Sequence, residues 1–241
     1  MSAYLAQVRT ELTLTLRQGE QMLVSVVIPV MLLVFFSMVE VLPTGTTDPV
    51  DFLAPAILAL AVMSSAMVSL GISTGFERQY LVLKRLGTTP LGRPRLVAAK
   101  ASTVVCIEAV QFAVLIPVAY LLGWSPDSTG WPSAAAGVLL GTLAFAGLGL
   151  LLAGTLPGTV TLGLANGLWL LFLLTGGMVF PLSELPDWLA ALSRLLPAAA
   201  LSEVVVGSLK AGAEVAGRAW IVLVIWAVAL PAAAAACFRW E

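Results

Sequence analysis

Few residues in this sequence could do chemistry inside its apolar stretches. Glu108 lies well within one long apolar run, and Gln111 follows three residues later, so both fall on one face of a predicted helix. Asn166 is a second amide, in a later run. A buried charge in lipid costs at least ~2.5 kcal/mol, so Glu108 is either protonated or faces a wet cavity or a polar partner. A structural hydrogen-bonding role and a role on a substrate path or proton relay both stay open.

Histidine is absent from the sequence, which excludes Ser-His-Asp catalysis, Cys-His catalysis and His-ligated zinc. The G-x-S-x-G pattern at residues 71–75 therefore has no histidine base, and Ser73 is predicted to be a small packing residue at a helix end. The stretch GTTPLGRP, residues 87–94, has Arg93 where a phosphate loop needs lysine, and no Ser or Thr follows it. We expect no nucleotide site, no metal site and no enzymatic activity in this chain.

The composition of the 241 residues indicates a membrane protein. Hydrophobic residues make up 60 %, charged residues only 10 %, and the mean hydropathy is +1.02, whereas a soluble domain carries about 25 % charged residues. The formal net charge of −1 argues against a nucleic-acid partner. Cys106 and Cys237 lie far apart in apolar runs, so we expect two buried apolar side chains and no redox pair.

Six apolar runs are long enough to cross a membrane as helices, since a span needs ~20 residues. The first is too long for the apolar part of a signal peptide and has no A-x-A cleavage site after it. We therefore predict an all-α integral membrane protein with one domain, residues 1–241, and six spans. The predicted spans are residues 22–42, 52–75, 100–122, 133–156, 159–180 and 217–237.

The distribution of lysine and arginine predicts the orientation. Five basic residues lie between the second and third predicted spans, a sixth, Lys100, begins the third, and others lie near both ends of the chain. Basic residues collect on the cytoplasmic side of membrane proteins. Both termini are therefore predicted to be cytoplasmic.

Two cytoplasmic elements outside the spans show helical periodicity. Residues 1–21 carry an apolar stripe typical of an amphipathic helix in the membrane interface. Residues 76–89 predict a short charged helix, because Phe76, Tyr80 and Leu83 repeat at helical spacing and Gly87 followed by Pro90 is a typical helix end. The stripe of the first helix consists of Leu5, Val8, Leu12 and Leu16.

On the outer side, residues 184–209 contain two apolar segments bounded by prolines. Each has ~11 residues and so reaches only ~16 Å at 1.5 Å per residue, which predicts a re-entrant pair of helices that turns at Pro197. Two G-x-x-x-G patterns, at residues 137–141 and 163–167, let helices approach closely in lipid. We expect both to pack within the chain, with a dimer interface as the alternative.

Residues 176–209 and 76–100 together resemble the membrane subunit of type-2 ATP-binding-cassette (ABC) transporters. The first stretch is similar to the family's signature after the fifth span, and FERQYLVLKRLGTTPLGRPRLVAAK is similar to its basic stretch after the second. The chain departs from the family in its minimal loops, and in having no arginine shortly before the last loop. The matching signature residues are Phe180, Pro181, Leu182, Leu185, Pro186, Trp188, Leu189, Leu196 and Pro197.

The resemblance implies a function and partners. The chain would be a permease that exports a hydrophobic or amphipathic substrate, a drug-like compound or a lipid, across the cytoplasmic membrane of a bacterium. It would bind no cofactor itself, since ATP and magnesium would belong to separate cytoplasmic ATPase subunits. A second permease copy or paralogue would complete a homo- or heterodimer, and membrane lipids would surround it.

The resemblance also implies roles for individual segments. Residues 1–21 would form the interface helix, residues 76–89 the coupling helix that contacts the ATPase, and residues 184–209 the helices that help to close an outer gate. Glu108, Gln111 and Asn166 are the candidates for a substrate path. The implied ATPase contacts are Glu77, Arg78, Tyr80, Leu81, Lys84 and Arg85. The implied gate residues are Phe180, Pro181, Pro186, Trp188 and Pro197.

Two other function classes remain as alternatives. A secondary transporter would use Glu108 to couple proton flow. Such transporters usually contain an internal repeat, whereas the first three and last three predicted spans of this chain show none. A membrane scaffold or sensor would use the basic loop to bind anionic lipids.

Overall fold

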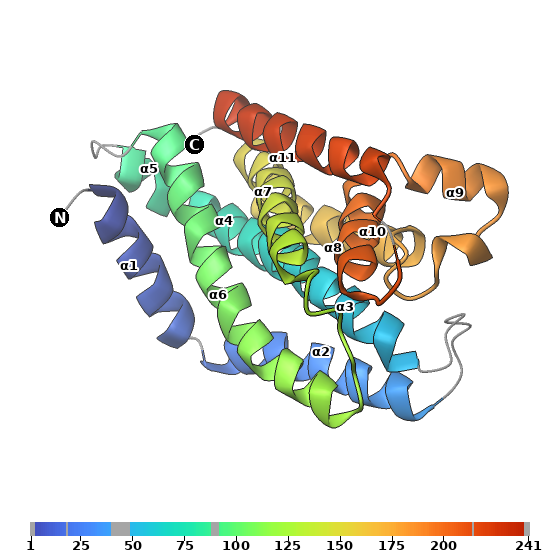
Figure 1. The fold of residues 1–241 in the computed structure, drawn as a ribbon. Coiled ribbons are helices and arrows are strands. Elements are labelled where there is room, and N and C mark those ends of the chain that lie inside the picture. Colours follow the sequence, from blue (N-terminus) through green and yellow to red (C-terminus); the bar gives the residue numbers. More distant parts are fainter. Residues whose placement is uncertain (1–2, 18, 40–48, 88–91, 214, 239–241) are drawn as a thin grey trace.

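The computed structural model describes residues 3–17, 19–39, 49–87, 92–213 and 215–238, and over these ranges the chain is helical with no strand (Figure 1). The prediction of an all-α protein is confirmed. The α-helices are α1 Ala3–Arg17, α2 Gly19–Met38, α3 Pro49–Met63, α4 Leu70–Gln79, α5 Val82–Gly87, α6 Arg93–Leu121, α7 Trp131–Thr155, α8 Gly158–Thr175, α9 Asp187–Ser193, α10 Pro197–Leu209 and α11 Gly217–Cys237. A π-helix, η1 Ser64–Ser69, joins α3 to α4, and a 3-10 helix, η2 Leu182–Glu184, precedes α9.

Five helical stretches within the described residues are long and apolar enough to cross a membrane, so the chain is a multi-pass membrane protein. The predicted first span is represented by α2, whose segment Ser25–Met38 is a shorter apolar helix; its last residues, 40–42, lie outside the described ranges. The predicted sixth span, residues 217–237, coincides with α11. The five stretches are Pro49–Gln79, Pro94–Leu121, Trp131–Thr155, Gly158–Thr175 and Gly217–Cys237.

The stretch Pro49–Gln79 forms the centre of the bundle and is mostly buried inside the protein. Glycine contacts explain how its neighbours come so close. A Cβ added at Gly71 would lie 3.1 Å from the backbone of Gly149 on α7, and a Cβ at Gly75 would lie 3.4 Å from Gly158 on α8. The hydrophobic effect does not drive helices together in lipid. Close contact between backbones stabilises their association through dispersion energy instead.

The two G-x-x-x-G patterns have different environments. Gly137 and Gly141 on α7 face Val204 and Leu201 of α10, with no room for a Cβ, so the predicted packing within the chain is confirmed for this pair. Gly163 and Gly167 on α8 are exposed and have no atom within 4 Å of an added Cβ. The same prediction is wrong for them, because this face of α8 lies on the surface of the chain.

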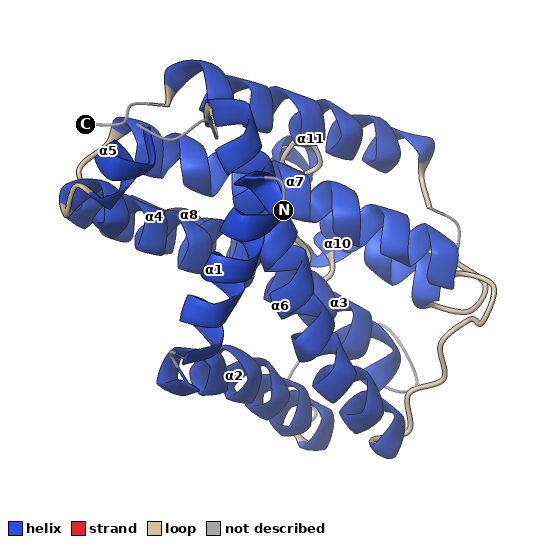
Figure 2. Ribbon diagram, turned by 90° about the vertical axis from the view of Figure 1, so that its left-hand side faces the viewer, coloured by secondary structure: helices blue, strands red, loops and turns tan. Residues whose placement is uncertain are grey.

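One end of the molecule brings together α5, the start of α6 and the end of α11 (Figure 1). Leu83, Leu96 and Phe238 form a buried apolar cluster there. Helix α1 lies along α6 at this side, as the view turned by 90° also shows (Figure 2). The N-terminal helix therefore lies beside the end of the basic segment, residues 76–100, where α6 begins.

The other end of the molecule carries α9, α10 and the loop before α7. The amide of Asp127 donates to the carbonyl of Leu209 at 2.9 Å, which ties this loop to the end of α10. The amide and hydroxyl of Thr129 both donate to Asp127 Oδ1 at 2.8 Å, and these bonds lower the pKa of this exposed carboxyl.

The segment predicted as a re-entrant pair contains two unlike helices. Helices α9 and α10 meet at a bend of 89°. Helix α10 is buried along most of its length against α7 and α3, whereas α9 lies at the edge of the molecule with Trp188 and Leu192 exposed (Figure 1). The bend coincides with Pro197, the first residue of α10. Because proline has no backbone N–H, it cannot donate a hydrogen bond to a carbonyl of the preceding turn.

The expectation that both cysteines are buried is wrong. Cys106 on α6 and Cys237 at the end of α11 are both exposed on the surface of the chain. An apolar run in a membrane helix has one face against protein and another turned away from it, so apolar neighbours in sequence do not imply burial in the bundle.

Candidate functional site

The charged segment 76–89 forms two pieces, which differs from the single helix predicted there. Helix α4 continues to Gln79, the chain breaks at Tyr80 and Leu81, and α5 begins at Val82. Leu81 has a φ of 61°, a left-handed conformation that costs a residue with a side chain about 1–2 kcal/mol. Residues 88 and 89 of the predicted helix lie outside the described ranges.

The break turns a mixed apolar and basic surface outward at this end of the molecule. The side chains of Tyr80 and Leu81 are 70 % and 52 % exposed, and Val82 beside them is also exposed. Lys84 and Arg85 on α5 are exposed as well. Large apolar side chains grouped on a surface and bordered by charge are typical of a protein-binding site.

Glu77 and Arg78, predicted to share this surface, contact the bundle instead. Arg78 Nη1 donates to the carbonyls of Ala153 and Leu156 at 3.3 and 3.2 Å. These carbonyls belong to the end of α7, where a helix leaves its last acceptors without partners. Arg78 therefore fixes α4 to the end of α7.

Glu77 takes part in an ion triad that joins three helices. Lys100 Nζ lies 2.9 Å from Glu11 Oε1 of α1 and 2.9 Å from Glu77 Oε2 of α4. The Lys100 side chain is fully buried, while the Glu11 and Glu77 side chains keep 14 % and 26 % exposure. The triad connects the N-terminal helix and the basic segment through the start of α6.

The sequence reasoning missed this triad. In the sequence, Lys100 counts only as one of the basic residues that follow the second predicted span, and Glu11 lies within the predicted amphipathic helix of residues 1–21. The pairing links positions 89 residues apart in sequence, so no local periodicity reports it. The one indication in the sequence that Lys100 has a partner is its position at the beginning of a long apolar run, because a charge there needs a counter-charge.

A cavity of about 420 Å³ lies among α1, α2, α3, η1, α4, α6 and α8, within the size range of about 300–1,000 Å³ that is usual for small-molecule sites. It brings together two of the predicted substrate-path residues, Gln111 and Asn166. Ser73, predicted to pack at a helix end, is exposed and lines this cavity instead. The other small polar residues that line it are Thr15, Ser25, Ser64, Ser65, Ser69 and Thr103.

A hydrogen bond to α2 fixes the side chain of Gln111 in the cavity wall. Its Nε2 donates to the carbonyl of Ser25 at 3.0 Å. The side chain is buried, and its Oε1 has no hydrogen-bond partner. Trp169 of α8 donates from Nε1 to Ser64 Oγ at 2.9 Å on another wall, and Asn166 Nδ2 donates to the Leu162 carbonyl at 2.8 Å.

Glu108, the third predicted substrate-path residue, is not part of the cavity lining. It is buried between η1 and α7, where Thr142 Oγ1 donates to its Oε2 at 2.6 Å and Ser65 Oγ to its Oε1 at 3.3 Å. The π-helical turn supplies Ser65, which contacts Glu108 and also lines the cavity. Of the two roles left open by the sequence, the contacts favour structural hydrogen bonding.

The predicted gate residues differ in their exposure. Pro197 is buried at the start of α10, Phe180 and Pro181 are half-buried, and Pro186 and Trp188 are exposed. A different group of charged residues joins α9, α10 and α11. Glu203 of α10 pairs with Arg218 of α11 at 3.2 Å and lies 3.8 Å from Arg194, just after α9.

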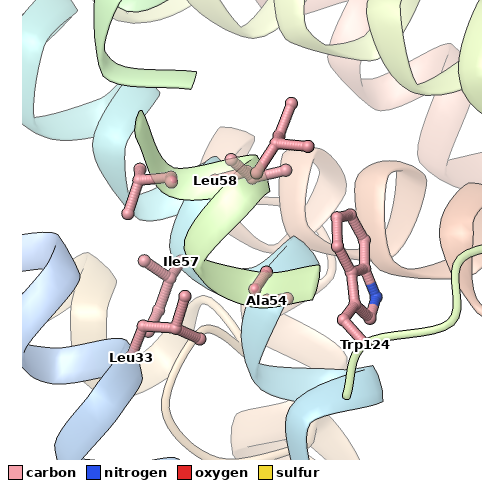
Figure 3. A pocket seen from close by; sticks show the side chains of 8 residues that line it. Leu33, Ala54, Ile57, Leu58 and Trp124 are labelled. Carbon is pink, nitrogen blue, oxygen red and sulfur yellow. The ribbon is translucent and has the colours of Figure 1, made fainter. Parts of the chain in front are cut away.

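A second concave region lies between α2, α3 and the end of α6, and Figure 3 shows its lining. Leu33, Ile57 and Leu58 pack there beside the indole of Trp124 (Figure 3). These side chains leave no space for a water molecule. The region is a packed apolar contact that fixes α2 to α3 and α6.

Among the residues with described positions, no group of three or more Asp, Glu, Cys or His side chains could hold a metal ion.

Comparison with known proteins identifies the chain. A sequence model described as ABC-2 type transporter matches residues 3–209, from α1 to the end of α10. The chain belongs to the ABC-2 type transporter family. No curated protein matches the chain.

Membership in the ABC-2 family establishes the general role of the chain. It is a membrane permease subunit of an ABC transporter, and such subunits work with an ABC ATPase subunit. The match includes the basic segment, the triad and the cavity, and it ends before α11.

Proposed function

We propose that this permease exports a hydrophobic or amphipathic molecule across the cytoplasmic membrane of a bacterium, powered by separate ATPase subunits. The observation that carries the substrate class is the cavity, where apolar side chains such as Ile28, Leu32 and Val68 stand beside hydroxyl and amide groups. A mixed lining of this kind suits a molecule with an apolar body and a polar end. Both termini are proposed to be cytoplasmic, on the side of the basic segment.

We place the ATPase contact at residues 80–85. Tyr80, Leu81 and Val82 offer apolar surface, and Lys84 and Arg85 add charge that can set the register with an acidic partner. This is a smaller set than the six residues expected from sequence, because Glu77 and Arg78 bind within the bundle.

The structure offers a mechanical route from this contact to the cavity. The segment 80–85 follows the long helix Pro49–Gln79, whose η1 and α4 parts line the cavity through Ser64, Ser69 and Ser73. A packed helix moves as a rigid body rather than bending continuously. Displacement of the contact by ATPase closure would therefore shift the cavity wall.

A second permease subunit is proposed to pack on α8. Gly163 and Gly167 lie there on an exposed face, and Val160, Leu164 and Leu171 are exposed on the same helix. Exposed small residues four apart let a helix of another subunit approach closely in lipid. The partner would be an identical chain or a paralogue.

Glu108 lies outside the cavity lining and accepts bonds from two hydroxyl groups. These contacts favour ATP-driven transport over the alternative in which Glu108 carries protons.

Co-purification tests the proposal. The tagged permease is expressed with its candidate ATPase, and the eluted complex is compared with that of the charge reversal Lys84→Glu/Arg85→Glu. We expect a stoichiometric ATPase with the unmodified chain and at least tenfold less with the reversal. The control Lys210→Glu, at the other end of the molecule, should retain the ATPase. Equal recovery with both variants would contradict the assigned contact.

A further inference from the structure

Three hydroxyl groups of the cavity donate their protons to backbone carbonyls of their own helices. Thr15 Oγ1 donates to the Glu11 carbonyl at 2.9 Å, Ser73 Oγ to the Leu70 carbonyl at 3.0 Å, and Thr103 Oγ1 to the Ala99 carbonyl at 3.0 Å. Each hydroxyl has one proton but two lone pairs. Once the proton is used in the helix, the group can only accept a further hydrogen bond.

Two of the larger polar side chains of the cavity also use an N–H group within the bundle. Trp169 uses its single N–H on Ser64 Oγ, and Ser64 Oγ in turn donates to the Leu60 carbonyl at 2.8 Å. Gln111 uses its Nε2 on the Ser25 carbonyl, while its buried Oε1 is left without a partner. An unsatisfied buried acceptor costs free energy, so a ligand that donates to Gln111 Oε1 would recover that cost.

The charges around the cavity disfavour an anion. Glu11 is the one ionisable side chain in the described lining, and no lysine or arginine belongs to that lining. Glu11 pairs with Lys100, which also pairs with Glu77, so the three groups sum formally to −1. A carboxylate or phosphate head would meet acceptors and a negative cluster, whereas an ammonium head would meet acceptors that it can satisfy.

We propose that this cavity binds amphiphiles with a primary ammonium head, which donates a hydrogen bond to Gln111 Oε1. The apolar part of the ligand then lies against Ile28, Leu32 and Val68. This inference rests on the proposed transport function and narrows its substrate class from amphipathic molecules in general to hydrogen-bond-donating cations.

The test uses three probes of equal chain length: dodecylamine, dodecyltrimethylammonium and dodecanoate. Binding to the full chain in phosphatidylcholine nanodiscs is measured by competition with radiolabelled dodecylamine, and empty nanodiscs give the background. The trimethylammonium probe has the charge but no N–H donor, so it separates charge from hydrogen bonding. We expect dodecylamine to bind at least tenfold more tightly than either of the other probes.

Variants assign the effect to Gln111. Gln111→Leu should weaken dodecylamine binding about tenfold and leave dodecyltrimethylammonium unchanged, and Gln111→Glu, which keeps an acceptor, should retain dodecylamine binding. Ser73→Phe, at an exposed position of the wall, should weaken binding of all cationic probes by filling the cavity. Val110→Leu, an exposed neighbour on α6 outside the lining, is the matched control.

Equal affinity for the three probes, or unchanged dodecylamine binding in Gln111→Leu, would overturn the inference. The binding assay needs no ATPase. A permease that fails it but still co-purifies with the ATPase would refute the ammonium preference alone, and loss of the ATPase would refute the proposed function separately.

Discussion

Replacing Lys100 by methionine should destabilise the permease strongly, because it leaves two carboxylates without their shared cation. Lys100 is fully buried and lies 2.9 Å from both Glu11 and Glu77. Removing one partner of a buried ion pair costs about 3–5 kcal/mol. Both carboxylates keep partial exposure and can recover some hydration, so we expect a loss near the lower limit, about 3 kcal/mol. For a chain of this size that corresponds to a fall in Tm of about 6–12 °C.

The assay is thermal unfolding of the purified chain in detergent, followed by tryptophan fluorescence, in a mutant cycle. Lys100→Met is measured alone and in the background Glu11→Gln/Glu77→Gln, where Lys100 is itself the buried charge without a partner and its replacement leaves no unpaired charge. We expect most of the loss to disappear in that background, while Lys210→Met, at a partly exposed lysine elsewhere, changes Tm little. Equal losses in both backgrounds would refute the triad as the source of the effect.

Three further predictions use the same melting assay. Glu108→Ala should cost about 1–3 kcal/mol, and Glu108→Gln, which can still pair with both hydroxyls, clearly less; equal losses would contradict a hydrogen-bonding role. Gly147→Ala should destabilise by about 1–3 kcal/mol, because its Cβ would overlap the backbone at Pro231, whereas Gly217→Ala has open space and should be neutral or stabilising; equal effects would contradict the packing argument. Leu81→Gly should raise Tm, because glycine adopts this left-handed conformation without the cost of about 1–2 kcal/mol that a residue with a side chain bears; an unchanged or lower Tm would contradict the strain argument.

The sequence predicted the fold class well, because membrane helices leave a long apolar signal that does not depend on tertiary contacts. It also placed Gln111 and Asn166, which do line one cavity. Ser73 was predicted to be a small packing residue at a helix end, and its place in the cavity wall became visible only once the packing of α4 was known.

The details that sequence could not supply depend on contacts between distant helices. The repeat of Phe76, Tyr80 and Leu83 predicted one helix over residues 76–89, but the chain breaks at Leu81, and Leu83 after the break packs in a cluster with Leu96 and Phe238. Likewise, identical G-x-x-x-G spacing describes both Gly137 on a buried face and Gly163 on an exposed one. Spacing defines a face, and only the neighbouring helix decides what covers it.

Photo-crosslinking tests the central claim, that residues 80–85 contact an ABC ATPase. A benzoylphenylalanine is placed at Tyr80 or at Trp188, two aromatic positions of equal 70 % exposure at opposite ends of the molecule. The permease is co-expressed with its candidate ATPase and irradiated in membranes. The account predicts a permease–ATPase adduct from position 80 and none from position 188. An adduct from position 188 alone would contradict both the contact and the orientation of the chain.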